Sequence, residues 1–83
     1  MATKREELAM LVLDQGCLGR AADDEPLFIL RAQDRAMVPT IRSWIEHALA
    51  AGTPAESPKL LEAAAYLRRV EIWQATHSCR APD

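Results

Sequence analysis

Four side chains of this sequence have the chemical types of metal ligands: Cys17, His47, His77 and Cys79. Zinc sites usually hold their ligands in closely spaced pairs, so that a single turn presents two of them at once. Only His77 and Cys79 stand that close, and no second pair accompanies them. We therefore expect two exposed histidines and two free thiols, with no metal, no cofactor and no obligatory disulfide.

The acidic run at residues 23–25 is a second candidate for chemistry. Three consecutive loop residues point in different directions, so adjacent acids rarely converge on one cation. They suit a solvated turn or the positive end of a following helix better. The three glycines are scattered singly, and no Ser/His/Asp or Cys/His pair falls on neighbouring elements. We expect no catalytic residues, and the chain is not predicted to be an enzyme.

The segment that follows is the strongest candidate for an interaction site. Residues 27–30 form a compact apolar run between Pro26 and Arg31. A helix capped by Asp23 or Asp24 is one interpretation, and we favour the other, a short extended segment at about 26–33. Both of its faces would be partly apolar, so helices or a partner must cover them, and we expect an acid to pair with Arg31 and fix the loop. The predicted interaction or loop-organising residues are Phe28, Leu30, Arg31, Gln33 and Asp34.

Helices must position this segment. Thr3-x-x-Glu6 is a capping-box pattern before an apolar run in which Leu8, Leu11 and Val12 share one face, and Gly16 is a suitable stop. This pattern predicts a helix at about 4–15, followed by a loop over 16–26. A buried strand remains the alternative for the same apolar run.

Two further helices are predicted at about 38–51 and 57–76. The first has apolar residues at helical spacing and ends at Gly52, and the second starts at Ser57-Pro58. Asp34 is a candidate cap before the first of them. The short loop between the two helices predicts an antiparallel hairpin, with Trp44 and Trp73 buried in its seam.

Length, charge and hydropathy bound the rest. At 83 residues the chain is expected to be one domain, mainly α: a small three-helix arrangement built on the hairpin, with the N-terminal helix packed on it. The net charge of −2 argues against nucleic-acid binding, which needs a basic face. The apolar run 8–13 is far shorter than the roughly 20 residues that span a bilayer, so we expect a cytoplasmic protein without a membrane partner.

One resemblance adds to this interpretation. The block Asp24-Glu25-Pro26-x-Phe28-x-Leu30-Arg31-Ala32-Gln33-Asp34, with a later Arg42-x-Trp44, resembles a family of small uncharacterised bacterial and bacteriophage-associated proteins. The similarity covers most of residues 23–83, including Trp73 and the closing Pro82-Asp83, and departs in the first sixteen residues. It implies a bacterial or phage origin and a cytoplasmic setting. No activity and no catalytic residues come with it.

Three classes of function follow. The favoured one is a small non-catalytic protein-interaction or accessory module, phage-related if the resemblance above holds, whose partner is another protein or a second copy of itself. The apolar runs 8–13 and 27–30 would expose more apolar surface than a monomer normally does, which favours a homodimer. The alternative is a nucleic-acid-linked regulator of helix-turn-helix type. A small metal-binding protein or enzyme is the second alternative.

Overall fold

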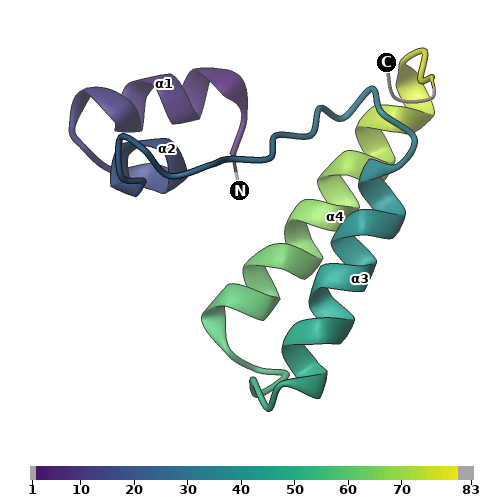
Figure 1. The fold of residues 1–83 in the computed structure, drawn as a ribbon. Helices are drawn as coiled ribbons and strands as arrows, with labels where there is room; N and C mark the ends of the chain where they lie inside the picture. Colours follow the sequence, from purple (N-terminus) through teal and green to yellow (C-terminus); the bar gives the residue numbers. More distant parts are fainter. Residues whose placement is uncertain (1, 81–83) are drawn as a thin grey trace.

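Two helical pairs joined by an extended connection make up the fold (Figure 1). The computed structural model describes residues 2–80. The first pair consists of α1 (Lys4–Val12) and α2 (Gly16–Arg20), and the second of α3 (Met37–Ala50) and α4 (Pro58–Thr76). No strand occurs within the described range, so the predicted mainly helical class is confirmed. None of these helices is long and apolar enough to cross a membrane.

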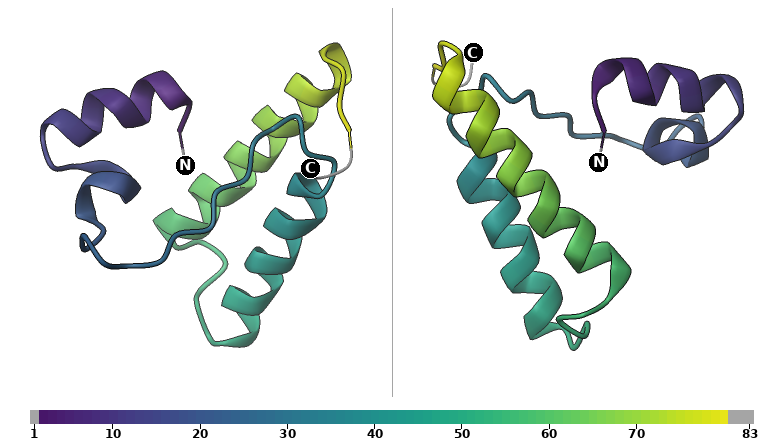
Figure 2. Two further views of the ribbon diagram at one scale, coloured as in Figure 1. Left: turned by 45° about the horizontal axis from the view of Figure 1, so that its top comes forward. Right: turned by 180° about the vertical axis from the view of Figure 1, so that it is seen from behind.

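Helices α3 and α4 run antiparallel and side by side, as the short loop between them predicts (Figures 1 and 2). The chain leaves α3 through a left-handed turn in which Gly52 has φ 98°. Its amide donates to Leu49 O, and the amide of Thr53 donates to Ala48 O, which together form a Schellman motif. At the start of α4, Ser57 Oγ accepts from the Leu60 amide at 3.3 Å. Both helices lie within a residue of their predicted bounds.

The N-terminal pair differs from the single helix and loop that the sequence predicts. Helix α1 ends at Val12, because the stop falls at Asp14 (φ 52°) rather than at Gly16. The Asp14 amide donates to Leu11 O and the Gln15 amide to Met10 O, so this turn is also a Schellman motif, with aspartate in place of glycine. The chain then forms the five-residue helix α2, which we predicted as loop.

Close packing holds α2 against α1. A Cβ atom added to Gly19 would lie 2.8 Å from the carbonyl carbon of Asp14, so only glycine fits where α2 passes the turn. Gly16, with φ 75°, lies against the side chains of Glu7 and Met10. These contacts identify the face of α1 that is turned toward α2.

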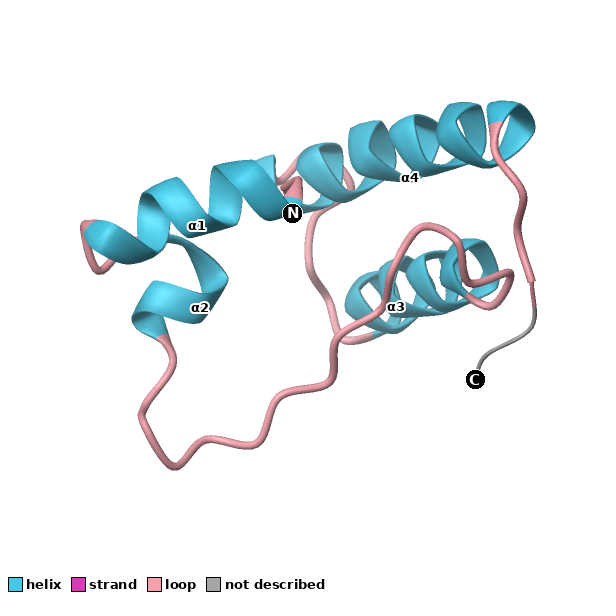
Figure 3. Ribbon diagram, turned by 90° about the horizontal axis from the view of Figure 1, so that it is seen from above, coloured by secondary structure: helices cyan, strands magenta, loops and turns pink. Residues whose placement is uncertain are grey.

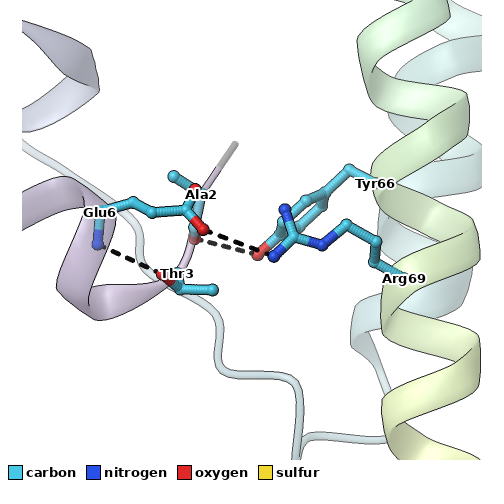
Figure 4. A network of polar contacts seen from close by, with 5 residues as sticks. All are labelled: Ala2, Thr3, Glu6, Tyr66 and Arg69. Carbon is cyan, nitrogen blue, oxygen red and sulfur yellow. Dashed lines mark hydrogen bonds and ion pairs between the residues drawn. The ribbon is translucent and has the colours of Figure 1, made fainter.

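The N-terminal pair does not pack on the hairpin, contrary to expectation. Helix α1 packs with α2, and α3 packs with α4. Two polar contacts tether the pair to the hairpin (Figure 4): Tyr66 Oη donates to Ala2 O at 3.4 Å, and Arg69 lies 3.6 Å from Glu6. Seen from above, α1 extends away from the end that carries these contacts (Figure 3).

The hairpin core is small. Its buried side chains are Met37, Leu60, Ala63 and Val70, and none of them is a large aromatic residue. The predicted burial of both tryptophans is wrong: Trp44 is 42% exposed and Trp73 37% exposed. Trp73 instead stacks on the ring of His77, with centroids 3.9 Å apart. The apolar stripe of each helix is wider than the seam, so its edge residues remain in solvent.

The accessible surface is large for the mass of the chain. It measures 6462 Å², whereas the scaling of folded monomers gives about 4,900 Å² for a chain of this mass. The radius of gyration is 13.8 Å, against about 12 Å for a compact domain of this length. The separation of the two helical pairs accounts for both differences.

Candidate interaction surface

An apolar groove lies where the connection between the two pairs crosses the hairpin. Its volume is about 260 Å³. It is lined by Phe28 and Leu30 from the connection, by Met37, Thr40, Ile41 and Trp44 from α3, and by Tyr66 from α4. We refer to these seven residues as the hairpin groove. Two of the five residues that the sequence singles out, Phe28 and Leu30, contribute to it.

The apolar run 27–30 belongs to no helix or strand and lies in the extended connection between the two helical pairs (Figure 2). Phe28 is 85% exposed and Ile29 69% exposed, whereas Leu30 is half-buried. Phe28 and Leu30 line the groove while Ile29 does not, which fits the alternation of side chains in an extended segment. An almost fully exposed phenylalanine beside a half-exposed tryptophan forms an apolar patch without a cover.

The connection is clamped where it enters α3. Gln74 Nε2 donates to Ala32 O at 2.9 Å and to Asp34 O at 3.1 Å. The Arg80 amide donates to Gln33 O, and the Arg35 amide donates to Arg80 O, both at 3.0 Å. Segment 32–35 is thereby fixed between α3 and the end of α4.

Sequence reasoning missed Gln74 as a partner of this segment. Its position continues the buried stripe of α4 at spacings of three and four, after Ala63, Leu67 and Val70. A polar side chain within an apolar stripe must find hydrogen-bond partners, and this was the available signal. Its partners, by contrast, are backbone carbonyls, which no side-chain pattern reveals.

Gln33, Asp34 and Arg31 contribute to the same segment in different ways. Gln33 and Asp34 contribute backbone atoms, as described above. Asp34 is not the cap of α3, because Ala36 holds that position. The Oδ1 atom of Asp34 accepts from the Ala36 amide at 2.7 Å, in a turn just before the helix. Arg31 is exposed, and the ion pair expected for it does not form with any acid in residues 2–80.

The possible metal ligands lie on different parts of the fold. Cys17 is exposed on α2, and Cys79 is half-buried, with Sγ 3.8 Å from Gln74 O. His77 Nδ1 lies 2.8 Å from Trp73 O at the end of α4. No group of three or more His, Cys, Asp or Glu side chains in residues 2–80 is placed to hold a metal ion. In the acidic run, the side chain of Glu25 closes a turn, and its Oε1 accepts from the Ala22 amide at 3.3 Å.

A second apolar surface lies on α1. Leu11 and Val12 stand three and four residues after Leu8, so the three share one side of the helix, and they are 51%, 42% and 83% exposed. Glu7 and Met10, which contact Gly16 at the start of α2, lie on the neighbouring side, with Leu11 next to Glu7. We refer to these three residues as the arm face.

Comparisons of the chain with protein-family models, with curated proteins and with solved structures found no match.

Proposed function

We propose that the protein is a small non-catalytic interaction or accessory module, and that the hairpin groove is its principal binding surface. The observation that carries the proposal is the surface excess: the chain exposes about 1,500 Å² more than a compact monomer of its mass. Stable protein interfaces bury about 800 Å² on each partner. The excess is therefore large enough for an interface of standard size or larger.

The composition of the groove supports a protein ligand. Interface centres are enriched in aromatic residues and methionine and depleted of charge. The groove combines Phe28, Trp44 and Tyr66 with Met37, and no charged residue of the described range 2–80 lines it. Aromatic side chains in such pockets commonly dominate binding energy.

The nucleic-acid alternative has less support. On α3 the guanidinium of Arg42 lies 3.7 Å from the carboxylate of Glu71, so a neighbouring acid offsets its charge. Specific and non-specific DNA binding both depend on cations that are free to replace phosphate counterions. The net charge of −2 points in the same direction.

The test compares two neighbouring substitutions in the exposed connection. Phe28→Glu places a charge in the groove, whereas the matched control Ile29→Glu places one at a highly exposed site outside it. Wild type and both variants are immobilised at equal density and exposed to extract of the native host, and the retained proteins are quantified by mass spectrometry.

We expect wild type and Ile29→Glu to retain the same discrete set of proteins, and Phe28→Glu to lose it. Identical sets on all three would contradict the groove as a binding surface. Circular dichroism of the variants serves as the control for folding, since neither residue contributes to the hairpin core.

A further inference from the structure

We infer that the partner of the hairpin groove is a second copy of this chain, and that the arm face of each copy docks in the groove of the other. The inference deepens the proposed function and rests on it. It joins the two apolar surfaces of the fold into one reciprocal contact with twofold symmetry, the commonest arrangement of oligomers.

The arm face is an apolar surface that nothing within residues 2–80 covers. Helix α1 turns Glu7 and Met10 toward α2 and leaves Leu8, Leu11 and Val12 in solvent. Leu8, with Leu11 and Val12 three and four residues later, has the spacing of anchor residues in helices that dock in grooves. Val12 is 83% exposed, so the monomer buries little of its apolar surface.

The geometry keeps the arm away from its own groove. Tyr66 and Arg69 tether Ala2 and Glu6, at the start of α1. From there α1 runs away from the hairpin (Figure 1), and Val12 is its last residue. A second copy can supply the cover that this arrangement denies to the chain itself.

The link between arm and hairpin is also adaptable enough for such docking. Residues 21–31, which precede the clamped segment 32–35, contain no helix or strand. The Arg69–Glu6 pair is about half exposed on both sides, and exposed ion pairs contribute little to stability. The arm can therefore adjust its direction on docking with little loss of contacts.

The areas agree with a dimer. Removing the excess from both copies would bury about 3,000 Å² in total, which falls in the range of permanent homodimers rather than of transient encounters. Twofold symmetry would divide the buried area into two equal arm-to-groove contacts.

Site-directed cross-linking tests the pairing of the two surfaces. In a background of Cys17→Ser and Cys79→Ser, one chain carries Val12→Cys in the arm, and a second, size-tagged chain carries Thr40→Cys in the groove. A third chain with Glu56→Cys, in the exposed loop between α3 and α4, is the matched control. The chains are mixed, oxidised and separated by size, and light scattering gives the mass of the untreated protein.

We expect a mass of twice 9.2 kDa, and a disulfide between the Val12→Cys and Thr40→Cys chains that the Glu56→Cys chain does not form. Val12→Glu should raise the dissociation constant about 100-fold, because a symmetric dimer loses the buried valine twice. Ala9→Glu, on another face of α1, should leave it within a factor of about three.

Three results would overturn the inference. One is a chain that stays monomeric at high micromolar concentration. Another is a dimer that cross-links only arm to arm or groove to groove. The third is a disulfide that forms within one monomer when a single chain carries both Val12→Cys and Thr40→Cys. That result would place the arm in its own groove. Each leaves the binding test with Phe28→Glu and Ile29→Glu to decide the proposed function separately.

Discussion

Adjacent leucines at the start of α4 offer a direct test of where the hairpin core lies. Leu60 is 4% exposed and Leu61 is 57% exposed. The substitutions Leu60→Ala and Leu61→Ala remove the same atoms from the same helix turn and change helix propensity equally. Any difference between them therefore measures burial.

The expected magnitudes differ several-fold. Truncating a buried leucine to alanine costs about 2–5 kcal/mol, and the lower part of that range applies where the surroundings can relax into the cavity. Leu60 lies in the first turn of α4, beside the interhelical loop, so we expect about 2–3 kcal/mol. Leu61→Ala should change the free energy of unfolding by no more than about 0.5 kcal/mol.

Thermal unfolding followed by circular dichroism at 222 nm measures both variants. For a domain of this size each 1 kcal/mol corresponds to about 4–8 °C, so Leu60→Ala should lower Tm by about 10–20 °C and Leu61→Ala by less than about 4 °C. All proteins are compared at one concentration, since association shifts apparent stability. Equal losses from the two variants, or a larger loss from Leu61→Ala, would refute the assigned packing of α4 on α3.

Two further predictions concern the parts that join the helices. Gly19→Ala should destabilise the N-terminal pair selectively, since its Cβ would meet the Asp14 carbonyl carbon at 2.8 Å. Hydrogen exchange should show loss of protection in α1 and α2 while α3 and α4 keep theirs, and uniform protection across all four helices would contradict the prediction. Gln74→Leu should lower the free energy of unfolding by about 1–3 kcal/mol, because the Ala32 and Asp34 carbonyls lose their donor. Hydrogen exchange of the Arg35 amide should accelerate in this variant. It should not accelerate in the control Gln33→Leu, which loses no backbone hydrogen bond.

Local signals in the sequence predicted the ends of the helices well. Thr3 Oγ1 accepts from the Glu6 amide at 3.2 Å, Ser57 caps α4, and Gly52 ends α3. Each of these depends on a few neighbouring residues, which is why pattern reasoning reaches them. The stop at Asp14 was missed because aspartate adopts the left-handed conformation less often than glycine does, and Gly16 stood two residues away.

Contacts between distant segments were not predictable in the same way. Gln74 meets backbone carbonyls some forty residues earlier in the chain, and Tyr66 meets the Ala2 carbonyl. Backbone acceptors are alike at every position, so the sequence does not distinguish the ones that are used. Of the candidate residues, Phe28 and Leu30 were identifiable from hydropathy alone, whereas the role of Gln33 depends on its backbone.

The misplaced tryptophans and the uncovered surfaces have a common physical origin. Helical periodicity identifies which face of a helix is apolar, but it does not say what covers that face. The prediction placed Trp44 and Trp73 in the seam of the hairpin, but they lie at the edges of their stripes and remain 42% and 37% exposed. Within residues 2–80, four buried side chains, one of them an alanine, make a small core. A second copy that brings its arm to the groove would cover Trp44 and the arm face between chains instead of within one.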